Sequence, residues 1–224
     1  MTEAGVVSLV VFDLDGTLVD SLADLAGAAN ATLARLAPEA TALSLTEVRS
    51  FVGDGAGKLV SRSLAARGVA ANRQEALSIF MTAYRGRLLA ETRLYDGIAD
   101  VLDAIAPGRT LAVLSNKPGE LCRTILDGLG VATRFARVWG GDDAPKKPDP
   151  AGLSRLVAEL GATRATTLMI GDSPNDVKAG RAAGVRSVGV GYGFDPAGTR
   201  AEEPDAWITA PRELVALLAR LDAA

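Results

Sequence analysis

Short, continuously apolar runs recur along the sequence, and each ends at a polar residue or a glycine. They lie at 6–12, 111–114, 137–139, 167–170 and 187–190, with a weaker one at 206–208. Apolar runs of this length are typical of strands covered on both faces, as in a parallel sheet. From residue 97 onward helical patterns separate the runs, at 97–106, 118–129, 150–160, 174–183 and 211–221. The alternation predicts an α/β fold, a doubly wound and mostly parallel sheet with a Rossmann-like core.

One stretch near the N-terminus interrupts this alternation. Helical patterns fill it at 22–36, 44–51, 55–67 and 73–90, and no strand pattern separates them. A helical block directly after the first strand indicates an inserted all-α cap. We therefore predict a catalytic core domain made of residues 1–19 and 89–224, and a helical cap domain made of residues 20–88.

The chain of 224 residues has no histidine and a single cysteine, Cys122. This composition excludes nucleophile systems and zinc sites that need histidine. Acid–base chemistry is left to carboxylates, lysine, tyrosine or the thiol, and a catalytic metal is expected to be a hard cation held by oxygen. A net charge of −3 gives no electrostatic sign of a nucleic-acid or membrane partner. The lone cysteine and the absence of a leader or membrane-span pattern favour a cytoplasmic protein.

Carboxylates follow two of the apolar runs. Asp13 and Asp15 come after the first run, and their spacing points both side chains the same way at the carboxyl end of a strand. Asp172 follows the run at 167–170, so it is expected at the same edge of the sheet, where open α/β sheets bind ligands. Adjacent carboxylates repel each other unless a cation or a shared proton offsets them. An aspartate-rich turn with no ligand is the alternative reading for the first pair.

Three further polar positions complete the pattern. Ser115 and Asn116 lie between a strand and a helix, where a hydroxyl and free N–H groups either bind phosphate or only cap the helix. Lys147 lies on a proline-containing loop and is either functional or a solvated surface lysine. Together, the carboxylates, hydroxyl and lysine favour Mg²⁺ and phosphoryl transfer without histidine.

This set of residues resembles the motifs of the haloacid dehalogenase superfamily of phosphohydrolases. The motifs are Asp13-Leu14-Asp15-Gly16-Thr17-Leu18-Val19-Asp20-Ser21, Ser115, Lys147-Pro148 and Gly171-Asp172-Ser173-x-x-Asp176. Segments 52–56, 140–143, 146–150 and 192–193 are similar to those of bacterial phosphoglycolate phosphatases within that superfamily. The resemblance covers the whole chain and includes a small helical cap. It implies an Mg²⁺-dependent phosphoric monoester hydrolase that converts 2-phosphoglycolate into glycolate and phosphate.

The resemblance also implies catalytic roles for three aspartates. Asp13 attacks phosphorus and becomes an aspartyl-phosphate. Asp15 protonates the leaving group and then takes a proton from the hydrolytic water. Mg²⁺ is held by Asp13, Asp172 and the backbone carbonyl of Asp15.

The remaining site residues are implied to bind the phosphate group. Ser115 and Asn116 contact it, and Lys147 both binds it and neutralises charge at the nucleophile. Asp176 is left open between a functional role beside Lys147 and a structural one at the start of a helix.

Several alternatives share parts of this pattern. A broad sugar-phosphate or nucleotide phosphatase and a sugar phosphomutase have the same core motifs. A dehalogenase would lack Asp15, and a phosphonoacetaldehyde hydrolase would need a cap lysine, for which Lys58 is the only candidate. A non-enzymatic phospho-receiver would need only about 120 residues and no helical insertion. The expected partner is a small phosphorylated substrate, and the expected assembly is a monomer or homodimer.

Overall fold

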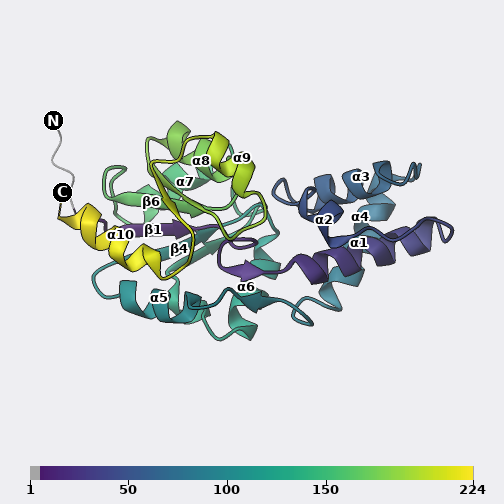
Figure 1. The fold of residues 1–224 in the computed structure, drawn as a ribbon, viewed down its shortest axis with the longest axis horizontal. Coiled ribbons are helices and arrows are strands. Elements are labelled where there is room, and N and C mark those ends of the chain that lie inside the picture. The colour runs from purple at the N-terminus through teal and green to yellow at the C-terminus, as the bar shows by residue number, and fades with distance from the viewer. Residues whose placement is uncertain (1–5, 224) are drawn as a thin grey trace.

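A six-stranded parallel sheet forms the centre of the computed structural model, which describes residues 6–223 (Figure 1). The strands are β1 (Leu9–Phe12), β4 (Thr110–Leu114), β5 (Arg137–Trp139), β6 (Thr167–Gly171), β7 (Arg186–Val190) and β8 (Ala206–Ile208). Their spatial order is β5–β4–β1–β6–β7–β8, and each neighbouring pair is parallel. Each predicted apolar run forms one strand, and the predicted α/β fold class is confirmed.

Helices cover both faces of this sheet because both faces of its strands are apolar. One face packs α5 (Ile98–Ile105), α6 (Gly119–Gly128) and α10 (Glu213–Asp222), and the other packs α7 (Ala151–Glu159) and α8 (Pro174–Ala183). Val10 and Phe12 belong to the first core, whereas Leu9 and Val11 belong to the second. Successive side chains of a strand point to opposite faces, so β1 contributes to both cores. Each such buried side chain contributes about 1.5–3 kcal/mol to folding.

The order of the strands creates a switch point beside β1. From β1 the chain moves outward through β4 and β5, and then returns to β6 on the other side of β1. Ligands of doubly wound sheets bind outside the carboxyl ends of the strands at such a point. The segments that follow β1, β4 and β6 therefore meet at one edge of the sheet.

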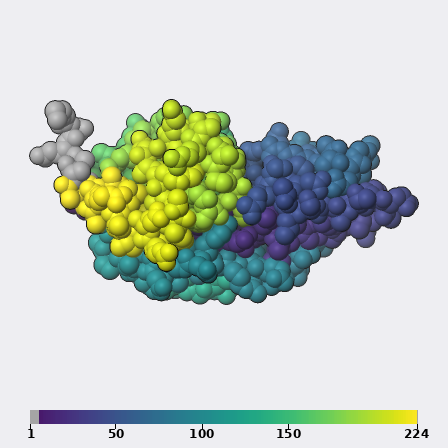
Figure 2. Space-filling model, viewed as in Figure 1, coloured from purple at the N-terminus to yellow at the C-terminus, as the bar shows by residue number. Residues whose placement is uncertain are grey.

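Four helices form a second part of the molecule, which projects from one end of the sheet (Figures 1 and 2). They are α1 (Leu22–Leu36), α2 (Leu45–Arg49), α3 (Ala56–Ala65) and α4 (Arg73–Arg85). Helix α1 packs against the other three, and Phe80 and Tyr84 of α4 are fully buried and stacked at 5.7 Å between ring centroids. Within the described chain, none of the helices is long and apolar enough to cross a membrane.

A two-stranded antiparallel ribbon, absent from the sequence prediction, joins the two parts. It consists of β2 (Val19–Asp20) and β3 (Arg93–Leu94). Strands of two residues carry no readable periodicity, so the sequence stretch from residue 20 was expected to be helical throughout. Two further elements absent from the sequence prediction are α9 (Pro196–Ala201) and a short 3₁₀ turn at Ala132–Arg134. We propose that this ribbon marks the boundary between a core of residues 1–19 and 89–224 and a cap of residues 20–88.

Candidate active site

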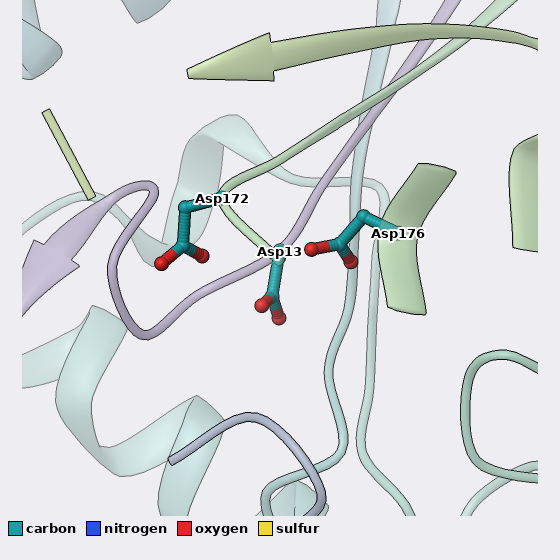
Figure 3. Close-up of side chains that lie close together, drawn as sticks. All are labelled: Asp13, Asp172 and Asp176. Carbon is teal, nitrogen blue, oxygen red and sulfur yellow. The ribbon is translucent and has the colours of Figure 1, made fainter. Parts of the chain in front are cut away.

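Three aspartates cluster at the carboxyl edge of the sheet (Figure 3). Asp13 follows β1, Asp172 follows β6, and Asp176 lies in the first turn of α8; one oxygen from each lies within 4.8 Å of the others. All three side chains are buried. Burial, opposed by Lys147, raises the pKa of Asp13 to about 6, and burial followed by the charges of Asp13 and Asp176 raises the pKa of Asp172 well above its usual range. Burial and the repulsion between the carboxylates therefore both disfavour a fully ionised cluster in the absence of a cation.

Lys147 reaches this cluster from the loop after β5. Its Nζ lies 3.0 Å from Asp13 Oδ1 and 2.6 Å from Asp176 Oδ1, and its side chain is 2% exposed. Burial lowers the pKa of a lysine, but the two carboxylates outweigh burial and raise the pKa of Lys147 to about 12. The lysine is therefore charged and fixed beside Asp13, and it is not a solvated surface residue.

Asp176 has both of the contacts that the sequence left open. Its Oδ2 accepts hydrogen bonds from Ser173 N at 3.0 Å and Ser173 Oγ at 2.6 Å, which caps the start of α8. Its Oδ1 accepts from Lys147 Nζ. One carboxylate thus connects the helix start to the lysine.

Asp172 is held by groups that come from two other loops. Thr17 Oγ1 donates to Oδ1 at 3.1 Å, and Phe194 N donates to Oδ2 at 2.7 Å. Gly16 has a φ of +87°, and a Cβ there would lie 2.0 Å from Asp172 Oδ2. The glycine of the first motif therefore lets the loop after β1 pass directly against this carboxylate.

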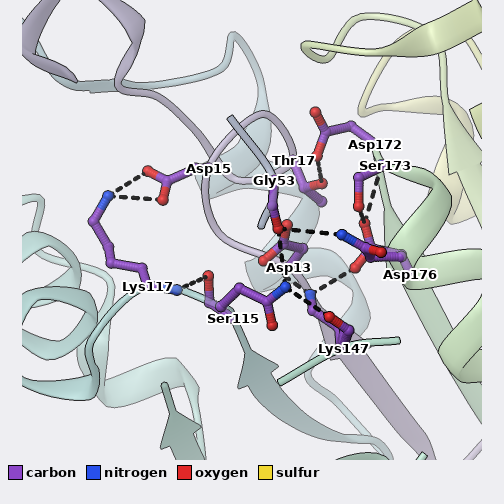
Figure 4. Close-up of polar contacts among 12 residues, drawn as sticks. Asp13, Asp15, Thr17, Gly53, Ser115, Lys117, Lys147, Asp172, Ser173 and Asp176 are labelled. Atoms are coloured by element: carbon purple, nitrogen blue, oxygen red, sulfur yellow. Dashed lines mark hydrogen bonds and ion pairs between the residues drawn. The ribbon is translucent and has the colours of Figure 1, made fainter. Parts of the chain in front are cut away.

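Ser115 and Asn116 occupy the segment after β4, as predicted, and both are buried. Ser115 Oγ accepts a hydrogen bond from Lys117 N at 3.4 Å. Asn116 Nδ2 donates to Lys147 O and Gly53 O, each at 2.9 Å, while its Oδ1 has no hydrogen-bond partner among residues 6–223. The asparagine amide is thus committed to holding the lysine loop and a cap loop together (Figure 4).

Asp15 does not join the aspartate cluster in this conformation. Its carboxylate accepts from Ser21 Oγ at 2.5 Å and from Lys117 Nζ, which lies 2.7 Å from both of its oxygens (Figure 4). Burial lowers the pKa of Lys117, but Asp15 outweighs burial and the net shift is upward. Sequence reasoning placed Lys117 beside Ser115 and Asn116 but gave it no role, because its partner lies 102 residues away.

The cap loop at 52–55 closes over the core. Asn175 Nδ2 donates to Asp54 Oδ1 at 2.8 Å and to Gly53 O at 3.3 Å. Arg62 pairs with Asp54 at 2.5 Å. Lys58 is exposed. These contacts to the core are therefore made by Gly53 and Asp54 of the loop, and not by the side chain of Lys58 or Arg62.

A cavity lies between the cap and the core at the aspartate cluster. Its polar lining includes Asp13, Asp15, Ser115 and Asp172. Its apolar lining comes mainly from the cap and consists of Leu25, Val52, Ala56, Leu59, Phe80, Met81 and Tyr84, together with Pro118, Leu121 and Phe194 of the core. The cavity could hold a small ligand against Asp13, with apolar side chains of the cap on its other side.

The donor set of the cluster fits a hard divalent cation. The three side chains supply only oxygen, which is the ligand type of Mg²⁺ and Ca²⁺. Asp176 Oδ1 is paired with the Lys147 ammonium, which would repel a metal ion there, and its Oδ2 already accepts two hydrogen bonds from Ser173, so Asp13 and Asp172 are the better ligands. Carboxylate oxygens retain lone pairs after one hydrogen bond each, so the contacts of Asp172 to Thr17 and Phe194 leave it able to coordinate.

Comparison with known proteins places this site in a family. Residues 10–190 match the model of the haloacid dehalogenase-like hydrolases, a range that includes the aspartate cluster, Ser115 and Lys147. The chain is 43% identical to the phosphoglycolate phosphatase of Rhodospirillum rubrum over 196 residues, 83% of this chain and 80% of that protein. It is 38% identical to the phosphoglycolate phosphatase of Colwellia psychrerythraea over 195 residues, 84% of this chain and 85% of that protein.

Solved structures agree with the sequence matches. The crystal structure of a predicted phosphoglycolate phosphatase from Haemophilus somnus 129pt superposes with a TM-score of 0.89 at 30% identity, over 97% of this chain and 99% of that one. The predicted family is therefore confirmed, and the chain belongs to the haloacid dehalogenase-like hydrolases.

Proposed function

We propose that this protein is an Mg²⁺-dependent phosphatase that hydrolyses 2-phosphoglycolate to glycolate and phosphate through an aspartyl-phosphate at Asp13. The family and the relatives directly support phosphoric monoester hydrolysis. The metal and the aspartyl-phosphate are supported mainly by one observation: Asp13 is a buried carboxylate that lines the cavity beside Lys147 and Asp172. The names of the relatives support 2-phosphoglycolate as the substrate.

The first step forms the aspartyl-phosphate. A carboxylate oxygen of Asp13 attacks phosphorus while the bond from phosphorus to the ester oxygen breaks. Asp15, which has separated from Lys117 and taken up a proton from solvent, gives that proton to the departing alkoxide. Lys147 stays beside Asp13 and offsets the charge of the phosphoryl group, and the Ser115 hydroxyl donates to a phosphoryl oxygen. Asn116 holds the lysine loop in position through Lys147 O.

The second step releases phosphate. Asp15, now a carboxylate, takes a proton from water as that water attacks phosphorus, and the oxygen of Asp13 leaves. This returns Asp15 to its protonated form and Asp13 to its carboxylate. The apolar cap lining limits other water at the reacting atoms while the cap is closed.

We propose that Mg²⁺ is held by Asp13, Asp172 and the backbone carbonyl of Asp15. The cation supplies charge neutralisation for the phosphoryl oxygens and offsets the repulsion between the aspartates. Asp172 is kept in place for this task by Thr17 and Phe194.

The proposal is tested by kcat/KM across a panel of phosphate esters with Mg²⁺. The panel contains 2-phosphoglycolate, hexose phosphates and nucleotides, and hexose 1-phosphates are also assayed for conversion to the 6-phosphate. We expect 2-phosphoglycolate to give the highest value and no isomerised product. A hexose phosphate or nucleotide that exceeds it tenfold, about 1.4 kcal/mol in transition-state binding, contradicts the proposed substrate.

Two alternatives from the sequence meet obstacles in the geometry. A Schiff-base hydrolase needs Lys58 in the cavity, but that side chain is exposed and does not line it. A dehalogenase has no use for a proton carrier at the position of Asp15. A cytoplasmic location, a monomeric or homodimeric state and the absence of nucleic-acid and membrane partners stay predictions of the sequence.

A further inference from the structure

The charged side chains that line the cavity are mostly acidic. This imbalance bears on how the cavity could bind the part of the substrate that lies beyond the phosphate. The cavity lining includes Asp13, Asp15, Asp172 and Asp195. Among the lining residues in the described part of the chain, only Lys117 is basic. A substrate with a second anionic group needs a cation away from the phosphate, and Lys147 is already paired with Asp13 and Asp176.

Lys117 lines the cavity and contacts the residue that is proposed to protonate the leaving group. Its Nζ lies 2.7 Å from both oxygens of Asp15, the proposed proton carrier, and its side chain is only 5% exposed. The residue belongs to the same segment as Ser115, since its backbone N–H donates to Ser115 Oγ. The ammonium group therefore lies beside the proposed proton carrier, which must part from it to reach the ester oxygen.

A second donor stands beside Lys117 and has no partner. Lys117 Nζ lies 4.8 Å from the centre of the Tyr84 ring. Tyr84 lines the cavity from the cap, is 1% exposed, and its hydroxyl has no hydrogen-bond partner within residues 6–223. A buried hydroxyl left unpaired costs about 1–3 kcal/mol, so its retention beside a ligand cavity points to a ligand atom that pairs with it.

We propose that Lys117 and Tyr84 form the binding site for a carboxylate on the leaving group of the substrate. This inference rests on the proposed function and deepens it. On binding, Lys117 exchanges the Asp15 carboxylate for that of the substrate, and the Tyr84 hydroxyl donates to the same group. Asp15, released from Lys117, takes up a proton from solvent and turns to the ester oxygen. Esters without a carboxylate do not compete for Lys117, so the exchange favours carboxylate-bearing esters such as 2-phosphoglycolate.

The test compares two esters that differ in this one group. Wild type, Lys117→Met, Lys117→Arg and Tyr84→Phe are assayed with 2-phosphoglycolate and with ethyl phosphate, whose leaving group lacks the carboxylate. We expect the ratio of the two kcat/KM values to fall about 30-fold in Lys117→Met and about fivefold in Tyr84→Phe, as for loss of a charged and a neutral hydrogen bond. Lys117→Arg keeps a cation and should retain most of the preference.

Two controls separate recognition from folding. Lys58→Met removes an exposed cap lysine outside the cavity and should leave the ratio unchanged. Tyr84→Phe removes a hydroxyl that has no hydrogen-bond partner of ordinary geometry within residues 6–223, so it tests the site even where Lys117→Met leaves Asp15 without its partner and unfolds. If the Lys117 and Tyr84 variants lose kcat/KM equally with both esters, the proposed carboxylate site is overturned, but the proposed function is not. A wild type that fails to hydrolyse 2-phosphoglycolate overturns the proposed function together with this inference.

Discussion

Replacing Asp172 by asparagine tests whether the aspartate cluster is built for a cation. Two unit charges 4.8 Å apart repel by about 3.5 kcal/mol at an effective dielectric constant of about 20, and Asp172 faces both Asp13 and Asp176 within that distance. The asparagine side chain has only one acceptor oxygen, so the variant loses the hydrogen bond from either Thr17 or Phe194. This loss costs about 1–3 kcal/mol. Without metal, the Asp172→Asn variant should therefore be at least as stable as wild type.

The presence of Mg²⁺ should reverse this order. A cation at 100 times its Kd stabilises the wild-type fold by about 2.7 kcal/mol, which for a chain of this size raises Tm by about 5–10 °C. The Asp172→Asn variant should gain little, because it lacks one of the two side-chain ligands. The assay is thermal unfolding of both proteins in EDTA and in a Mg²⁺ titration.

A matched control and two contrary results complete this experiment. Asp205 also accepts hydrogen bonds from a backbone N–H and a hydroxyl, both of Ser187, but it lies toward the opposite end of β7. Asp205→Asn should respond to Mg²⁺ as wild type does. Equal stabilisation of Asp172→Asn by Mg²⁺ would refute the metal assignment. A large loss of stability of that variant in EDTA would refute the argument from repulsion.

Three other substitutions test the cap and the packing around the site. Hydrogen bonds, above all the one from Arg67, lower the pKa of Glu47 from 4.5 to about 2. The ionised Glu47 side chain therefore stabilises the fold above pH 4.5, and this contribution is lost as the pH falls toward 2. The Tm of Glu47→Gln should lie below that of wild type at pH 6 and converge with it on acidification; a constant difference contradicts this. Phe80→Ala empties a fully buried position and should lower the unfolding free energy in urea by about 3–5 kcal/mol, whereas a loss under 1 kcal/mol contradicts the packing. Gly193→Ala brings a Cβ within 2.2 Å of Asp172 Cβ and should weaken Mg²⁺ affinity about tenfold by titration; unchanged affinity argues against the assigned ligand.

The sheet and the aspartates after it could be predicted because each depends on local pattern. Strands buried on both faces, such as β1 and β6, are continuous apolar runs, and parallel strands bring their carboxyl ends to one edge. Asp13 and Asp172 were therefore placed together although 159 positions separate them, and the structure brings them within 4.8 Å. The start of α8 could also be predicted from local pattern, because Ser173 and Asp176 lie at the beginning of that helix.

The remaining features depend on contacts that no local pattern records. The ribbon of β2 and β3 is too short for periodicity, and its pairing joins the two ends of the cap. Lys117 pairs with Asp15, which is distant in the sequence, and Tyr84 of a cap helix packs beside Lys117. In the sequence, Tyr84 fits the pattern of an ordinary buried residue of that helix.

The nucleophile is the central claim, and Asp13→Asn tests it most directly. Turnover of 2-phosphoglycolate is measured with saturating Mg²⁺ for this variant and for wild type, alongside thermal unfolding to establish that the variant is folded. Removal of a nucleophile lowers turnover by about 10⁴-fold or more, so we expect a folded protein with no phosphate release above background. Phosphate release by folded Asp13→Asn at a rate near that of wild type would contradict the account.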